Sequence, residues 1–72
     1  MKHKYNIGDL VRINTTAKNP MNYLSGIIVE IITTESIGDD LVWYYKVRLP
    51  TSFGFYLETY EEENLIFLKE SD

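Results

Sequence analysis

Apolar and polar residues alternate along much of the chain, which is the pattern of β-strands with one buried face. The clearest run is LVWYYKVRL at 41–49, where five apolar residues share one face and Lys46 and Arg48 lie on the other. Shorter alternating runs cover 10–14 and 53–60. A β-branched run at 27–32 and the short run LIFL at 65–68 bring the number of predicted strands to five.

Turn-forming residues separate these runs. Gly8-Asp9 precedes the first strand, and Gly38-Asp39 favours a hairpin between the second and the third. Residues 15–25 form a long loop after the first strand. The run YEEEN at 60–64 cannot alternate in and out of a small core, so it predicts one 3-10 or helical turn before the last strand.

These elements predict a single all-β domain over 1–72, with a core at about 5–68 and tails at 1–4 and 69–72. No helix of 10 or more residues is expected. Five short strands must hide their edges, and closure into a small barrel does so. The residues expected to be most buried are Val11, Ile13, Ile31, Trp43, Tyr45, Val47, Phe55, Leu57 and Leu65.

The order of GDLVRI, a loop, GIIVEI, a hairpin, YYKVRL and YEEENLIFL resembles the small SH3-like barrels of prokaryotes, which include KOW-type domains and short phage or plasmid proteins. The resemblance runs from about Tyr5 to Leu68. It implies a five-stranded SH3-like barrel with a long first loop and a short 3-10 turn before the last strand. It implies little about function, because this fold hosts many unrelated activities. The matching positions are Gly8, Asp9, Val11, Gly26, Ile28, Ile31, Tyr45, Val47, Glu62 and Leu65.

The register of the second strand, 26–33, stays open at this point. Strict alternation groups Ile27, Val29 and Ile31 on one face, whereas the resemblance would bury Ile28 and Ile31. Both hold if the strand carries a bulge or a strong bend, because either shifts the register by one residue.

Composition and charge narrow the classes of protein. The chain has no cysteine, so neither a disulfide nor a thiolate metal site can stabilise its small core. No apolar stretch reaches the roughly 18 residues of a membrane span, and no signal-peptide pattern follows the basic start, so a cytoplasmic protein without membrane contact is expected. The net charge is −4, and 58–72 carries six carboxylates. Because duplex DNA is bound through Lys and Arg that displace counterions, tight binding to duplex DNA is not expected.

The sequence lacks a catalytic set. His3 is the one histidine, and it is expected to be disordered or at the surface. No cysteine, nucleophile elbow or glycine-rich phosphate loop accompanies it. The run Glu61-Glu62-Glu63 has no His or Asp beside it at ligand spacing and is expected to be a solvated turn. We therefore expect no enzyme activity, no cofactor and no metal site.

A protein-binding surface is the first functional hypothesis. Long loops on a rigid scaffold often carry binding residues, and the loop 15–25 offers Met21, Asn22 and Tyr23 beside the hairpin tip at 33–40. The alternative is that Tyr23 folds back to cap the barrel. The chain would then be a small non-enzymatic protein-binding module, and its composition suits an accessory or regulatory protein of a phage or mobile element. The partner's identity and the oligomeric state stay open.

The second hypothesis is a KOW-like contact to single-stranded nucleic acid or ribonucleoprotein. Arg12, Tyr44, Lys46 and Arg48 fall on outward-facing strand positions, and basic residues combined with aromatic rings are typical of such surfaces. The alternative is that these charges are ordinary surface residues that protect strands from edge pairing.

Overall fold

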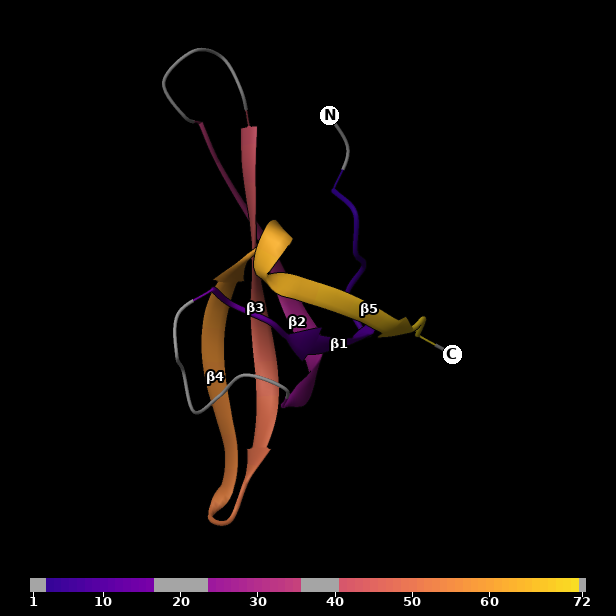
Figure 1. The fold of residues 1–72 in the computed structure, drawn as a ribbon, viewed down its shortest axis with the longest axis vertical. Coiled ribbons are helices and arrows are strands. Elements are labelled where there is room, and N and C mark those ends of the chain that lie inside the picture. The colour runs from indigo at the N-terminus through magenta and orange to yellow at the C-terminus, as the bar shows by residue number, and fades with distance from the viewer. Residues whose placement is uncertain (1–2, 17–23, 36–40, 72) are drawn as a thin grey trace.

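The computed structural model describes residues 3–16, 24–35 and 41–71, and this part of the chain is all-β (Figure 1). The prediction of five strands and of one short turn at 60–64 is confirmed, and the described residues contain no α-helix. The elements are β1 Leu10–Ile13, β2 Ser25–Glu35, β3 Leu41–Thr51, β4 Gly54–Glu61, the 3-10 helix η1 Glu62–Asn64, and β5 Leu65–Lys69.

The strands form one antiparallel sheet in the order β4-β3-β2-β1-β5. In Figure 1, β3 runs along the molecule, with β2 and β4 beside different parts of its length, and β1 and β5 cross it at a steep angle. The long hairpins follow from the sequence, because β3 and its neighbours are rich in β-branched and aromatic residues that favour extended backbone.

One side of the sheet holds the core. Tyr45, Val47 and Leu49 of β3 are fully buried there, and we call this side the inner face. The opposite side, onto which Lys46 and Arg48 point, is the outer face. Of the nine residues predicted to be most buried, five are confirmed, and Ile31 and Trp43 are partly buried against the core. The buried hydrophobic residues are Tyr5, Val11, Ile13, Ile28, Tyr45, Val47, Leu49, Tyr60 and Leu65.

The prediction that Phe55 and Leu57 are buried is wrong. Both side chains are exposed, because Phe55 pairs with Pro50 and Leu57 pairs with Arg48, which places them on the outer face. Cross-strand partners share a face of the sheet. The inner face of β4 instead carries Tyr60, which pairs with Tyr45 and is buried.

A bulge in β2 settles the register that the sequence left open. The pairing with β3 shifts between Ile28 and Glu30, so that Val29 is an extra residue. Ile28 is therefore fully buried on the inner face, while Ile27 and Val29 are exposed. The bulge also lets Ile31 pack against the core from the same face as Ile28, as the resemblance implied.

The Gly8-Asp9 turn joins the two ends of the described chain. The buried Asp9 carboxylate accepts hydrogen bonds from the backbone N–H groups of Asn6 (2.9 Å) and Ser71 (3.0 Å). Gly8 has a φ of 96°, and a Cβ there would lie 2.5 Å from Ser71 Oγ. Glycine is required at this position for both reasons. The motif that opens the sequence pattern is thus a structural junction.

Candidate functional site

The described residues contain no cluster of side chains suited to a metal ion. None of their His, Asp and Glu side chains form a group of three that could hold a metal ion. No helix in that part of the chain is long and apolar enough to cross a membrane. His3 is partly buried: its Nδ1 donates to the Tyr5 carbonyl oxygen at 2.7 Å, and its ring meets the Trp43 ring edge to face, with 5.3 Å between the ring centres.

A polar cluster around Tyr45 holds the N-terminal segment on the sheet. The Tyr45 hydroxyl donates to the Glu62 carboxylate and accepts from the backbone N–H groups of Lys4 (3.0 Å) and Tyr5 (3.2 Å). Burial, followed by the hydrogen bond to Glu62, raises the pKa of Tyr45 to about 12. The Tyr45 hydroxyl thus has its partners within the chain, so we assign the cluster to stability.

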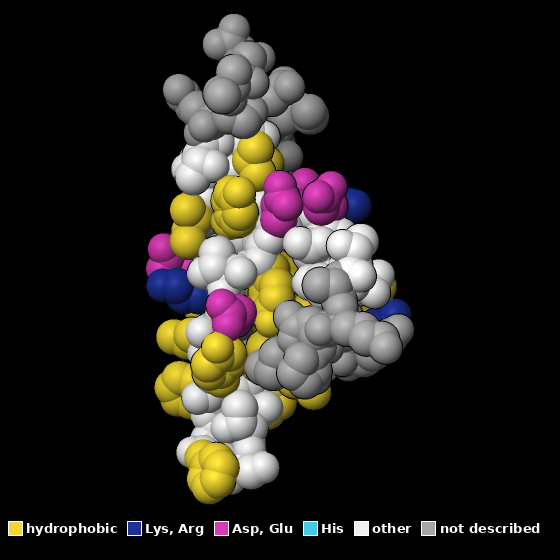
Figure 2. All heavy atoms as spheres, turned by 60° about the vertical axis from the view of Figure 1, so that its left-hand side comes forward, with side chains coloured by type: hydrophobic (Ala, Val, Ile, Leu, Met, Phe, Trp, Pro, Cys, Tyr) yellow, Lys and Arg dark blue, Asp and Glu magenta, His cyan; other side chains and the backbone are white. Residues whose placement is uncertain are grey.

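Exposed apolar side chains gather instead on the outer face of the sheet. Register places Leu10, Ile27, Arg48 and Leu57 opposite one another across β1, β2, β3 and β4. Ile27 and Leu57 are 39% and 46% exposed. Together with Leu10, they place three large apolar residues in one cross-strand row, and a soluble protein normally covers such a row. In Figure 2, hydrophobic side chains run down one side of the molecule, with a few charged side chains between them.

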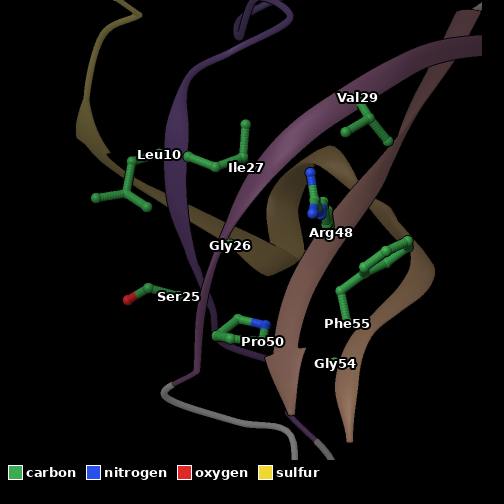
Figure 3. Close-up of a pocket in the computed structure, with 9 residues that line it drawn as sticks. All are labelled: Leu10, Ser25, Gly26, Ile27, Val29, Arg48, Pro50, Gly54 and Phe55. Atoms are coloured by element: carbon green, nitrogen blue, oxygen red, sulfur yellow. The ribbon is translucent and has the colours of Figure 1, made fainter.

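A shallow groove of about 580 Å³ lies within this face. Figure 3 shows Leu10 of β1 and Phe55 of β4 at opposite ends, with Arg48 between them. Arg48 is the one charged side chain among the described residues that line the groove. Its guanidinium carbon lies 4.3 Å from the centre of the Phe55 ring, a cation–π contact that holds the charge over the groove. The lining residues are Leu10, Ser25, Gly26, Ile27, Val29, Arg48, Pro50, Gly54 and Phe55.

The residues of the nucleic-acid hypothesis do share the outer face. Tyr44, Lys46 and Arg48 alternate with the buried residues of β3, and Arg12 alternates with the buried residues of β1 on the same side as Leu10. Lys46 Nζ lies 3.5 Å from the Glu30 carboxylate, so part of its charge is offset. Tyr44 is partly buried.

The residues of the loop hypothesis, Met21, Asn22 and Tyr23, lie outside the described residues, as does the hairpin tip at 36–40. That hypothesis stays a prediction. Sequence reasoning did not find the apolar outer face, although one signal was present. In IIV at 27–29 and in FYL at 55–57, apolar residues occupy both faces of a strand, whereas one core needs apolar residues on one face alone.

The remaining tyrosines of β4 differ in environment. Tyr56 is exposed and donates to a Glu58 carboxylate oxygen at 2.6 Å, which raises the pKa of Tyr56. Tyr60 is buried, and burial, followed by the nearby charges of Glu58 and Tyr56, raises its pKa. Its hydroxyl has no hydrogen-bond partner among the residues that the structure describes. Neither residue lines the groove, and we assign neither to the candidate site.

Comparison of this chain with protein-family models, with curated proteins and with solved structures finds no match. The outer face is therefore assigned from its own geometry: a row of exposed apolar side chains, a groove, and one arginine held above it.

Proposed function

We propose that the chain is a non-enzymatic protein-binding module with the build of an SH3-like barrel, and that it binds its partner on the outer face of the sheet. Three features support the barrel: the strand order β4-β3-β2-β1-β5, the hairpins on both sides of β3, and the 3-10 turn that leads into β5. The last of these, the short 3-10 turn before the final strand, is also what the resemblance to SH3-like proteins implies.

The apolar groove is the observation that carries the binding function. Exposed apolar surface that is contiguous across several strands marks an interaction site more often than a scatter of single residues does. Here Leu10, Ile27, Val29 and Phe55 line one groove. Burying such surface in a complex is favourable at about 25 cal/mol per Å², whereas in the free chain it faces water.

Charge favours a protein over a nucleic acid as the partner. A nucleic-acid site needs several cations along a backbone, with aromatic platforms between them. Arg48 is the one cation among the described residues that line the groove, and Lys46, which lies on the same face, is paired with Glu30. With a net charge of −4, the chain as a whole repels phosphates. A partner that presents apolar side chains and a carboxylate matches the groove in both respects.

The test starts from a random dodecapeptide library that is selected on the immobilised protein. The best binder is then titrated against Leu57→Thr, which removes apolar surface beside Arg48. Leu41→Thr is the matched control, because Leu41 is a half-exposed leucine of β3 that lies seven residues away from Arg48. We expect at least a tenfold loss of affinity for Leu57→Thr and less than a twofold loss for Leu41→Thr.

Equal affinity of both variants would move the binding surface away from the outer face. Failure of the library to yield a binder, together with salt-dependent binding of a single-stranded oligonucleotide, would favour the nucleic-acid hypothesis instead.

A further inference from the structure

We infer that the groove receives a short extended segment of the partner, in which one carboxylate side chain is flanked by apolar side chains. This inference rests on the proposed function and specifies its ligand. It follows from the width of the groove, from the position of its one charge, and from the kind of anion that a single arginine suits.

The width of the groove sets the length of the segment. The groove extends from Leu10 on β1 to Phe55 on β4, and therefore crosses three gaps between neighbouring strands. Strands lie about 4.8 Å apart, so this span is about 14 Å. An extended chain advances about 3.3 Å per residue, so four or five residues cross the groove from end to end.

The position of Arg48 sets the chemistry at the middle of the segment. Register places Arg48 between Ile27 on β2 and Leu57 on β4. In Figure 3, Ile27 and Phe55 lie on either side of Arg48. A ligand that lies across the strands covers the guanidinium. A covered charge is unfavourable unless an opposite charge pairs with it. An aspartate or glutamate at the centre of the segment provides that pair, in the bidentate geometry that arginine favours.

A second copy of this chain fits the groove less well. If two copies stacked their outer faces about a two-fold axis through the groove, Arg48 of each would approach Arg48 of the other. Like charges in a desolvated interface repel each other. A phosphate group fits less well too, because one arginine would leave part of its charge unpaired.

The Phe55 ring positions the guanidinium for this role. Arg48 has long, flexible side-chain bonds, and its exposed head would otherwise sample many orientations. Contact with the ring at 4.3 Å limits these orientations before the ligand arrives. Arg48→Lys keeps the charge but loses the planar stacking, so it separates charge from orientation.

The test uses three pentapeptide libraries that are random at four positions and fixed as Asp, Asn or Lys at the centre. Binding to the intact protein is measured by fluorescence polarisation at 0.15 M salt, and the unfolding midpoint of every variant is measured in parallel. We expect the Asp library to bind at least fivefold more tightly than the Asn library. Arg48→Gln should abolish that preference, Arg48→Lys should keep part of it, and Arg48→Glu should turn it toward the Lys library.

The set of outcomes distinguishes failure of this inference from failure of the proposed function. Equal binding of the Asp and Asn libraries, or an unchanged Asp preference in Arg48→Gln, overturns the inference. If Phe55→Thr still weakens all three libraries, the proposed function survives that result. Binding that is unaffected by both Arg48→Gln and Phe55→Thr, or absent from the intact protein, overturns both. Should Arg48→Gln unfold, Arg48→Lys together with the Asp-to-Asn comparison decides the question.

Discussion

The two faces of the sheet carry similar apolar side chains but differ in how far these side chains are buried. On the inner face, Val47 and Leu49 are fully buried, whereas on the outer face Val29 and Leu57 are exposed. The difference comes from the rest of the chain: the N-terminal segment with Tyr5 and the strand β5 with Leu65 supply core residues to the inner face. Apolar residues on a strand therefore specify where surface can be buried, and the path of the chain decides which face it buries itself.

Packing shows the same contrast at the scale of one methyl group. A Cβ added at Gly26 would lie 2.5 Å from the Arg48 carbonyl oxygen and 2.6 Å from Val47 Cγ1. On the other side of the same glycine, the groove is open. At Gly26, therefore, the inner face is closely packed, while the outer face has room for a ligand.

The largest predicted difference in stability between the two faces concerns two leucines, Leu49 and Leu57. Leu49→Ala should lower the free energy of unfolding by about 2–4 kcal/mol, because it leaves a cavity in the inner face. Leu57→Ala should change it by less than about 1 kcal/mol, because the side chain is already in contact with water. Urea denaturation of both variants measures the difference. Equal losses would show that the outer face is part of the folded core.

The next prediction sharpens the packing contrast. Gly26→Ala should destabilise the protein by about 1–3 kcal/mol, because the added methyl group meets backbone and buried side chains that cannot withdraw freely. Ser25→Ala, one residue earlier in β2, is the control and should have a smaller effect. Thermal unfolding of the pair reports the difference. Unchanged stability of Gly26→Ala would mean that β2 and β3 are not in close contact there.

A third prediction concerns the polar anchor of the inner face. Tyr45→Phe removes the hydroxyl that binds Glu62 and leaves the Tyr5 N–H without its partner, so it should cost about 1–2 kcal/mol at pH 7. Because the pKa of Tyr45 is raised from 10.0 to about 12, the neutral hydroxyl stabilises the fold fully below pH 10, and this stabilisation is lost as the pH rises through 12.

The alkaline half of this prediction has its own measurement. Between pH 8 and pH 11, the intact protein should lose about 1 kcal/mol more of its unfolding free energy than Tyr45→Phe does. Tyr56 and Tyr60 titrate in both proteins and cancel in the comparison. Parallel stability curves for the two proteins would contradict the anchoring role of Tyr45.

The smallest effect is expected at Tyr60, the buried tyrosine of β4. The Tyr60 hydroxyl is buried and has no hydrogen-bond partner in the described part of the chain, so Tyr60→Phe removes a polar group that folding desolvates without compensation. Stability should stay the same or rise by up to about 1 kcal/mol. A loss comparable to that of Tyr45→Phe in the same denaturation experiment would mean that Tyr60 does have a partner.

Much of the fold could be predicted from the sequence because the period-two pattern and the turn residues are local signals. The strand 41–49 and the turn at 60–64 were predicted in this way, and both are present. The face of β4 was predicted wrongly. Alternation at 53–60 defines two faces, and the one with Phe55 and Leu57 is the more apolar, yet the pairing of Tyr60 with Tyr45 turns that face outward. Such pairing is a long-range property that no local pattern contains.

The candidate site could be predicted only in part for the same reason. Lys46 and Arg48 were assigned to the outward face of β3, and this is correct. Their apolar neighbours on that face come from β1, β2 and β4, and their positions depend on the register of three strand pairs and on the bulge at Val29. A bulge changes which side chain faces outward without leaving a clear mark in the sequence.

The most direct test of the two-face account is a methyl NMR titration of the protein with a peptide selected from the library. The outer face offers Ile27, Val29 and Leu57, and the inner face offers Ile13, Val11 and Leu65 as residues of the same types. The account predicts that bound peptide shifts the methyl signals of the outer three and leaves the inner three nearly unchanged. Shifts that are confined to the inner three, or that fall on neither set while the peptide binds, would contradict it.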